Sequence, residues 1–562
     1  MAVVRTRLLD ASYGQNNRVV VSVLRTGFVL AVLVLAARGT RAQPQDRPLP
    51  STAADRLARA DIVFTGFDVL PPDRLEAMKK KAPLQTGKPV ALSGLQQTAR
   101  LALAALRNAG YAYARIDVLE TTVAPGHVRI EFRADPGLQT VFGAIDITGN
   151  TSVADSVVRR ELAYMPGQVF SAAAMEESQR RLQRLGIFES AEITLLDPVN
   201  QSAGAPTRVT VKERDLTPFT YAAGYGSEEQ LFADATWRHL NFLGGARTFS
   251  ARGRWSWLDR GVEGGFIQPY LFRPGLTLGV RGYVWDVDDA TYDVLSKGGG
   301  ASLAYEMGRN TLTGSYVQEL AHVRIPIGAQ IDEPSRVQLT TLGVDATSGA
   351  QNGVLAALQF GATRDARDEA MVESGEVTRG YLAAIRLEQA GGWLPGRFNY
   401  VSVSGDVRYY RGAGRVTIAG RLQYGAIDPM GPRSDIPFSK RYFLGGSDTL
   451  RGWGRLEVSP RSPSSLPLGG QSFAVTTGEL RIPVAGPFGA VLFVDAGNVW
   501  ANTWALSARL RSDGGTGLRY RSPFGLFRVD VGYQFTPIEG LTVDGNPQNR
   551  RWRIHVDMGH TF

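Results

Sequence analysis

The residues best suited to chemistry lie in one glycine-rich stretch, where Arg451, Gly452 and Trp453 stand at the centre of residues 440–455. A guanidinium presents five donors in a rigid fork, and a carboxylate is the acceptor that matches this fork best. Asp495 offers such a carboxylate in a run that reads as a strand. We therefore expect Arg451 to form a structural ion pair with Asp495. The motif alone leaves a second interpretation open, in which a glycine-rich hairpin carries a solvated arginine.

The patterns that mark catalytic and metal sites are missing from the sequence. It has no GxSxG elbow, no GxxxxGK loop and no GxGxxG fingerprint, and the absence of cysteine removes thiolate chemistry. No two histidines have the spacing of metal ligands; they are His127, His239, His322, His555 and His560. We predict that the protein is not an enzyme and holds no cofactor and no metal.

The first sixty residues predict export. Residues 26–37 form an apolar run that is too short to span a bilayer, which needs about 20 residues. Arg25 precedes this run and the small residue Ala42 follows it, as in a secretory signal peptide over residues 1–42. Residues 43–60 then read as a linker. The net charge of +9 is not gathered into one basic tract, so we expect no nucleic-acid partner.

Two small α+β repeats follow, at residues 61–135 and 138–214, each with the order strand, helix, helix, strand, strand. Recurrence of one order after roughly eighty residues indicates two copies of one module. In the second copy a turn at Gly149 leads to Ser152, which we expect to cap the next helix.

Residues 217–562 alternate apolar and polar side chains with the period of a strand. In one segment the apolar members are Phe527, Val529, Val531 and Tyr533, and the polar members between them include Arg528, Asp530 and Gln534. Either a soluble sandwich or a membrane barrel could carry this pattern. Export and charged residues on nearly every strand favour an antiparallel transmembrane barrel, of sixteen strands by its length, with its apolar face against lipid.

Several segments resemble the BamA/TamA superfamily of outer-membrane barrels, which insert or translocate other proteins. They are the Arg451 stretch, residues 478–483, 493–500 and 517–525, and, in the second repeat, GNTSVADSVVRREL and RLQRLGIFESAEI. The second repeat resembles a POTRA domain of the BamA type, and the first resembles a more divergent one. The chain also ends on an aromatic residue, as such barrels do.

The resemblance implies roles for particular residues. A loop around residues 440–470 is expected to fold inward and to carry Arg451 into the lumen. Asp495 is its implied acceptor, Glu479 is a second acceptor, and Gly497 gives the backbone room to approach.

Barrel closure should pair the first strand with the last. The residues expected to mark this seam and the terminal signature are Phe219, Tyr221, Trp552 and Phe562. Pro218 cannot donate to the ladder, and glycines weaken the first strand, so we expect the seam to be weak.

The implied function is assembly or translocation of unfolded β-rich proteins at the bacterial outer membrane, with the POTRA modules in the periplasm. Clients would add to the sheet edges 111–119 and 188–195, and the barrel would open laterally. The alternatives are a two-partner secretion transporter that exports a dedicated exoprotein and a passive barrel. Expected partners are the client proteins, outer-membrane lipid and a periplasm-spanning protein.

Overall fold

The computed structural model describes residues 59–558, with gaps at 88–89, 126, 197–202, 290, 328–330, 369–370, 373–375, 432–435, 508, 523–524 and 544–545. The expected signal peptide, nearly all of the expected linker and Phe562 lie outside the described residues. The described chain divides into two compact units, one ending at Glu213 and the other beginning at Arg214.

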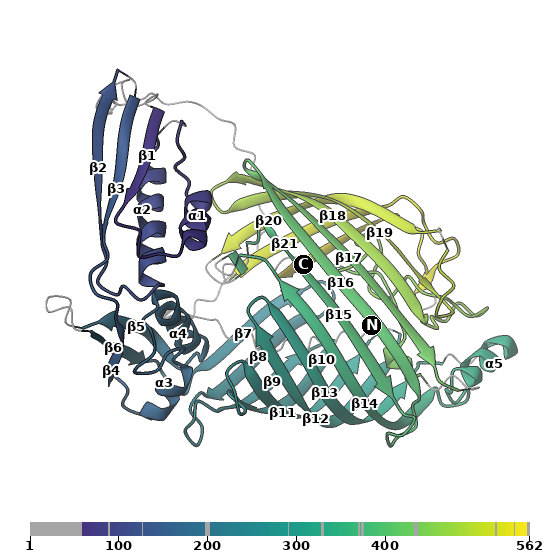
Figure 1. The fold of residues 1–562 in the computed structure, drawn as a ribbon. Coiled ribbons are helices and arrows are strands. Elements are labelled where there is room, and N and C mark those ends of the chain that lie inside the picture. Colours follow the sequence, from purple (N-terminus) through teal and green to yellow (C-terminus); the bar gives the residue numbers. More distant parts are fainter. Residues whose placement is uncertain are drawn as a thin grey trace, which may run out of the picture. The chain divides into compact units, whose positions relative to one another are not determined.

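The N-terminal unit contains two modules of the same order (Figure 1). The elements of the first are β1 (Arg59–Thr65), α1 (Pro72–Lys81), α2 (Leu92–Arg107), β2 (Arg115–Ala124) and β3 (His127–Asp135). Those of the second are β4 (Val141–Thr148), α3 (Asp155–Glu161), α4 (Ala172–Arg184), β5 (Phe188–Leu195) and β6 (Gly204–Glu213). The sheet orders are β1-β3-β2 and β4-β6-β5, so the last strand of each module in sequence lies in the middle of its sheet.

One helix face and one sheet face form the core of each module. In the first module α2 buries Thr98, Ala102 and Leu106, which follow the helical repeat, against Ile130 and Phe132 of β3. No helix among the described residues is long and apolar enough to cross a membrane.

β2 starts later than the expected strand at Tyr111. The reason is a turn over Tyr111–Ala114, in which the Ala114 N–H donates to the Tyr111 carbonyl at 3.2 Å. The strand therefore begins at Arg115 and extends to Ala124.

The segment before α3 is held by a carboxylate and not by the expected cap. Ser152 is not the N-cap, because Ala154 occupies that position and makes no side-chain cap. Instead, Glu213 at the end of β6 accepts from the backbone N–H groups of Thr151, Ser152 and Val153 at 2.7, 2.8 and 2.8 Å. Partial burial raises the pKa of Glu213, but these hydrogen bonds outweigh it and lower that pKa below its usual range.

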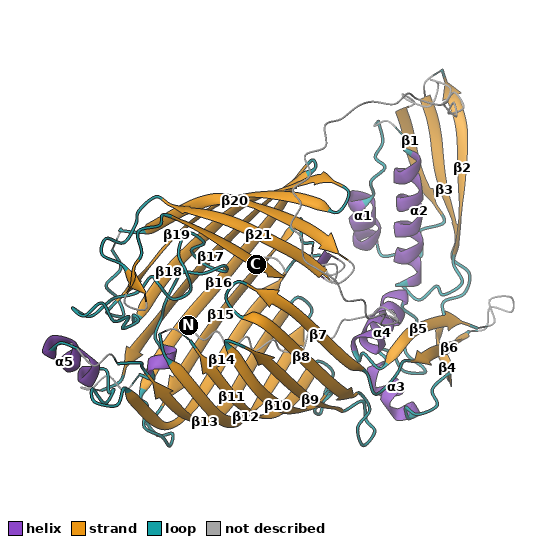
Figure 2. Ribbon diagram, turned by 180° about the vertical axis from the view of Figure 1, so that it is seen from behind, coloured by secondary structure: helices purple, strands orange, loops and turns teal. Residues whose placement is uncertain are grey.

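The C-terminal unit is a barrel of sixteen antiparallel strands in chain order (Figure 1, Figure 2). The strands are β7 (Phe219–Gly226), β8 (Gln230–His239), β9 (Thr248–Ser256), β10 (Asp259–Gln268), β11 (Leu276–Asp288), β12 (Asp293–Met307), β13 (Asn310–Arg324), β14 (Ala350–Asp365), β15 (Gly380–Ala390), β16 (Tyr400–Ala413), β17 (Val416–Pro429), β18 (Ser472–Ala485), β19 (Phe488–Trp500), β20 (Arg511–Ser522), β21 (Gly525–Gln534) and β24 (Trp552–Met558). Short elements lie between them: α5 (Glu333–Thr341), η2 (Phe438–Lys440), β22 (Thr542–Val543) and β23 (Asn546–Pro547).

In the wall of this barrel the apolar side chains face outward and the charged side chains face inward, the reverse of the arrangement in a soluble protein. On β21 the apolar Val529 and Val531 are 38 % and 39 % exposed, whereas Arg528 and Asp530 between them are 4 % and 0 % exposed. Apolar side chains that face outward require lipid around them, and polar ones then line the inside. The predicted fold class, α+β modules followed by a sixteen-stranded transmembrane barrel, is confirmed.

We expect Glu213→Gln to loosen the segment before α3, because a neutral amide is a weaker acceptor than a carboxylate. Solvent screening reduces the usual value of such bonds, so the expected loss is about 1 kcal/mol. Since the pKa of Glu213 is lowered on folding, its stabilisation is complete above the ordinary glutamate pKa of about 4.3 and is lost as the pH falls through the lowered value. Hydrogen exchange of the amides of residues 151–153, relative to their intrinsic rates, measures the effect.

Glu192→Gln provides the matched control, because Glu192 is an exposed glutamate on β5 of the same module. Equal protection of residues 151–153 in the Glu213→Gln variant and the parent would contradict the prediction.

Candidate functional site

The inward loop, defined as residues 436–471, connects β17 to β18 and folds back against the inside of the wall. Leu444 and Val458 close it with two backbone hydrogen bonds of 2.9 Å. Gly445 has a φ of +105°, and a Cβ there would lie 2.3 Å from the Gly454 carbonyl oxygen, so only glycine fits. The loop therefore presents a fixed tip, defined as residues 446–453, to the wall.

Two buried apolar clusters hold the loop in place. The first packs loop residues against β18 and β19; its members include Leu444, Leu450, Trp453, Phe473, Val475 and Val499. The second packs the loop against β12, β13 and α5; its members include Phe438, Phe443, Leu456, Val294, Val323 and Leu339. Trp453 thus serves as a packing residue at the base of the tip.

Arg451 lies at the centre of the contact between loop and wall. Its Nε and Nη2 donate to the two carboxylate oxygens of Asp495 at 2.8 and 2.9 Å, and Nη1 donates to Glu479 at 2.7 Å. All three side chains are 0 or 1 % exposed. The guanidinium carbon also lies 3.5 Å from the ring centre of Phe493, a cation–π contact. The structure therefore brings Arg451, Asp495 and Glu479 together.

Further charges complete this cluster. Asp530 of β21 lies 3.9 Å from Arg451 and accepts from Arg519 at 2.7 Å. Arg481 donates to Glu479 at 2.9 Å. A buried charge is tolerated only when it is paired, and Asp495, Glu479 and Asp530 each form an ion pair with at least one guanidinium. Asp530 was not expected in this cluster, although its position on the polar face of a strand is a signal for an inward-facing charge.

The backbone of the tip is bound as well as the side chain. The Gly452 carbonyl accepts from Gln534 at 2.7 Å, and the Arg451 carbonyl lies 3.0 Å from Nε2 of His555. A Cβ on Gly452 would lie 2.7 Å from Cβ of Asp513, so the glycine lets the tip approach β20. Side chains of β18, β19, β20, β21 and β24 therefore all contact the loop tip.

Gly497 lies away from the tip. A Cβ there would lie 2.6 Å from the Ala474 carbonyl oxygen and 3.0 Å from Val475. The close approach that Gly497 permits is thus that of β18, the neighbouring strand, and not that of Arg451.

A second attachment, absent from the sequence analysis, joins the loop to β14–β16. Lys440 lies 3.5 Å from the Glu388 carboxylate, which also accepts from Gln359 at 2.8 Å and from the Tyr400 hydroxyl. Glu388 and Tyr400 are buried. β14, β15 and β16 are remote in sequence from the Arg451 cluster, so no local motif predicts the contact between Lys440 and Glu388.

Among the described residues expected at the seam, Phe219 and Tyr221 lie on β7 with their ring centres 6.3 Å apart, and Trp552 lies on β24. Phe219 and Tyr221 on β7 and Trp552 on β24 are all exposed, in keeping with an outward position in lipid. Phe562 lies outside the described residues. Each of the sixteen strands runs antiparallel to its neighbours, so the first strand, β7, and the last, β24, run in opposite directions. Phe219 and Trp552 are the first residues of these strands and therefore lie at opposite ends of the barrel.

The described contacts across the seam come from other residues. The Ser227 N–H donates to the Val556 carbonyl at 2.7 Å, and the Val556 N–H donates to the Ser227 hydroxyl at 3.2 Å. A Cβ on Gly226 would lie 3.0 Å from Asp557. β7 and β24 are the two ends of the sheet order, and no strand pairing joins their described residues.

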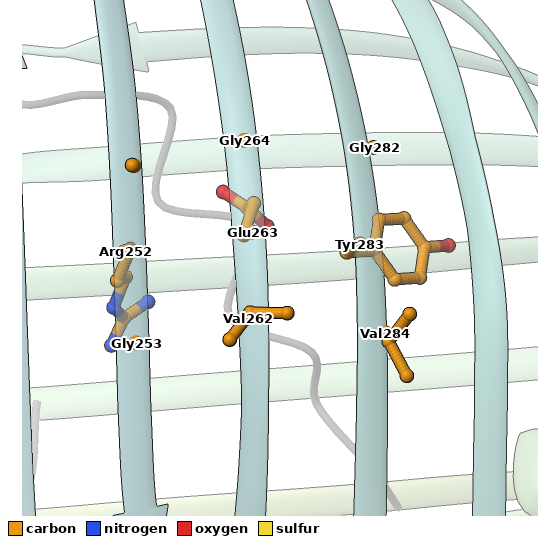
Figure 3. Close-up of a pocket in the computed structure, with 9 residues that line it drawn as sticks. Arg252, Gly253, Val262, Glu263, Gly264, Gly282, Tyr283 and Val284 are labelled. Carbon is orange, nitrogen blue, oxygen red and sulfur yellow. The ribbon is translucent and has the colours of Figure 1, made fainter.

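A hollow of about 560 Å³ lies at the wall of β9, β10 and β11 (Figure 3). Its polar lining residues are Arg252, Glu263 and Tyr283, which occupy paired positions on the three strands. Arg252 donates to Asp234 at 2.8 Å and Tyr283 to Glu319 at 2.5 Å, so both are already engaged. Within the described ranges no group of three or more His, Asp or Glu side chains is arranged to hold a metal ion.

Modules of this order before a sixteen-stranded barrel with an inward loop define a class of outer-membrane barrels. A family model described as the Omp85 superfamily domain matches residues 241–562, and a POTRA model, described as a surface antigen variable number repeat, matches residues 140–214. The chain belongs to the Omp85 superfamily, to which BamA also belongs. The resemblance seen in the sequence is confirmed, as is the location of the barrel in the outer membrane and of the POTRA module in the periplasm.

Individual relatives agree. The chain is 25 % identical over 497 residues to the outer membrane protein assembly factor BamA of Neisseria meningitidis serogroup B, which covers 81 % of this chain and 61 % of that protein. The crystal structure of BamA from Haemophilus ducreyi lacking POTRA domains 1–3 superposes with a TM-score of 0.67 at 19 % identity, over 90 % of this chain and 99 % of that chain. CdiB from Acinetobacter baumannii shares the fold, with a TM-score of 0.51 at 12 % identity, over 91 % and 92 %.

The chain spans about three fifths of the length of the curated relatives it matches. These relatives are assembly factors by name.

We expect Arg451→Ala and Asp495→Ala each to release the inward loop. Each change leaves an opposite charge buried without its partner, which typically costs about 3–5 kcal/mol. Arg451→Lys should release it too, because a single ammonium cannot reproduce the fork that reaches both carboxylates. Limited proteolysis of the folded barrel measures the release as new cleavage within residues 436–471.

Arg461→Ala serves as the control, because Arg461 lies in the same loop and donates to the backbone carbonyls of Glu457, Ser465 and Thr542 and not to a carboxylate of the wall. Unchanged protection of the loop in both alanine variants would show that the ion cluster does not hold it.

Proposed function

We propose that the protein is an outer-membrane assembly factor. In this proposal the N-terminal modules bind unfolded β-rich clients in the periplasm, and the barrel inserts them into the membrane or translocates them through a laterally opening seam. The observation that carries the proposal is the seam itself, where no strand pairing joins the described residues of β7 and β24 and one hydrogen bond between backbone groups, from Ser227 directly after β7 to Val556 of β24, crosses it. An unpaired strand edge is very costly in lipid unless another strand can pair with it.

The sheet edges of the modules support client binding. β2 and β5 are edge strands of their three-stranded sheets, so each leaves one side of its backbone unpaired within its sheet. β2 also exposes the apolar side chains of Val118, Leu119 and Val123. An extended client segment can add to such an edge through main-chain hydrogen bonds without a strict sequence requirement.

The first module is part of this proposal. Its strand order and helix placement match those of the second, which the POTRA model covers. We therefore treat residues 61–135 as a second POTRA domain, so that two edges are available in tandem. The inward loop, with Arg451 bound to Asp495 and Glu479, acts in this proposal as a structural latch for the closing strands.

A second candidate is export of a dedicated exoprotein, to which the fold shared with CdiB gives some support. The two candidates predict different losses on depletion of the protein. Loss of many outer-membrane proteins supports assembly, whereas loss of one secreted protein from the medium supports export.

We expect a disulfide between Gly226→Cys and Asp557→Cys to abolish client insertion, because it joins β7 to β24 and prevents lateral opening. The two positions are close, since a Cβ on Gly226 would lie 3.0 Å from the Asp557 carboxylate. The natural sequence has no cysteine, so no other disulfide can form. The outer-membrane proteome of cells that depend on this protein is compared with the bond oxidised and reduced.

The matched control links Ala223→Cys and Ala233→Cys, which are directly opposite on the paired strands β7 and β8. This bond joins strands that are already paired, so activity should persist. Full client insertion with the seam disulfide intact would rule out lateral opening.

A further inference from the structure

We propose that Glu228 is a positioning residue that ties the inward loop to the first hairpin of the barrel, so that the loop clasps the two sides of the seam together. This inference rests on the proposed function, because it assigns to one side chain the control of the opening. Glu228 lies in the turn between β7 and β8, and no pattern in the sequence singles it out.

The inward loop matters at the seam because direct backbone contact between β24 and the end of β7 is limited. Across the seam, the described residues offer the Ser227–Val556 backbone bond, the Val556 bond to the Ser227 hydroxyl, and a side-chain contact in which Nδ1 of His555 on β24 lies 3.6 Å from Oε1 of Glu228. By contrast, the neighbouring strands β7 and β8 are paired over eight positions, from Phe219 to Gly226. A joint with so few backbone bonds gains much of its strength from side chains that bridge it.

On the first side of the seam, Glu228 binds the loop tip. Its Oε1 accepts from the Ser447 N–H at 2.6 Å, and its Oε2 lies 3.6 Å from Arg455. A Cβ on Gly446 would lie 2.6 Å from Oε1, so a glycine is needed for the carboxylate to reach the backbone. A carboxylate that accepts from a backbone N–H beside a guanidinium forms a charge-assisted contact, which is stronger than a neutral one.

On the second side, the same loop residue is bound by the closing strands. Arg528 of β21 donates to the Ser447 carbonyl at 3.3 Å, to its hydroxyl at 3.2 Å and to Asp448 at 2.8 Å. Its Nη2 also lies 3.5 Å from Asp557 of β24. Ser447 therefore receives a contact from each side of the seam, with Glu228 on one and Arg528 on the other.

Two more contacts bind the loop to β24 alone. Arg553 donates to Glu457 at 2.5 Å, and His555 lies 3.0 Å from the Arg451 carbonyl oxygen. Together with the Arg451 cluster, these contacts keep the loop on the closing strands when Glu228 is removed. Loss of Glu228 is therefore expected to free the first hairpin and leave the rest of the loop in place.

The adjacent glutamate gives a matched comparison. Glu229 forms an ion pair with Arg254 of β9, which lies on the same side of the seam as β7 and β8. Both residues are partly buried glutamates in one turn, and each contacts an arginine. Only Glu228 connects that turn to the loop in the contacts of the described residues.

The test measures the distance across the seam in the full-length protein in lipid nanodiscs. Spin labels are placed at Tyr225→Cys on β7 and Ile554→Cys on β24, where both native side chains are exposed on the outer face. We expect Glu228→Gln to shift the distance distribution to longer values, and Glu229→Gln to leave it unchanged. Hydrogen exchange of the loop peptide that contains Ser447 should become faster in the Glu228→Gln protein only.

Heat-dependent migration in gels shows whether each variant barrel is folded. If the Glu228→Gln barrel does not fold, Glu228→Asp replaces it, because the shorter side chain withdraws the carboxylate from Ser447 while it keeps the charge. Unchanged distances in the folded Glu228 variant, or equal shifts for Glu228→Gln and Glu229→Gln, would overturn the proposal. The distance measurement needs no client. If the seam widens in the Glu228→Gln protein while the parent protein has no assembly activity, the proposed function is rejected and the role of Glu228 is retained.

Discussion

The structure of the closing half of the barrel depends on one buried guanidinium. Arg451 is fully buried, and its donors reach Asp495 and Glu479, on two neighbouring strands. A charge in this position is tolerated only with its acceptors in place, so the loop that carries it and the strands that carry the acceptors form one unit. The glycines around the tip follow from this constraint, because the backbone has to approach the wall closely.

The outer and inner faces of the wall meet different demands. Lipid requires apolar side chains outside, and the polar side chains that alternate with them must then find partners inside. In the strands from β18 to β24 the inward loop provides many of these partners, through Arg451, the Gly452 carbonyl and Ser447. The loop therefore supplies hydrogen-bond and ion-pair partners to polar side chains on the inner face of the wall.

Local patterns in the sequence predicted a good part of this arrangement. Strand alternation over residues 527–533 predicted the face of each residue, and the Arg451 motif predicted Asp495 as an acceptor because it lies in a recognisable strand. Glu479 was expected as a second acceptor from the family resemblance. The contact of Glu228 with Ser447 joins residues 219 positions apart, and it depends on how the barrel closes, which no local pattern records. Lys440 with Glu388, and Glu213 with the segment before α3, were missed for the same reason. The expected cap at Ser152 was wrong because α3 begins at Asp155 with Ala154 at the N-cap, while the distant Glu213 carboxylate binds the backbone donors of residues 151–153.

Arg451 and Asp495 are expected to stabilise the barrel as a pair. The most direct measurement is a double-mutant cycle on the free energy of unfolding in detergent, with Arg451→Ala, Asp495→Ala and the double variant. We expect the double variant to be much less destabilised than the sum of the single variants, with a coupling of about 2–3 kcal/mol, because removal of both charges leaves neither one buried alone. Additive effects of the two changes, with a coupling near zero, would contradict this expectation.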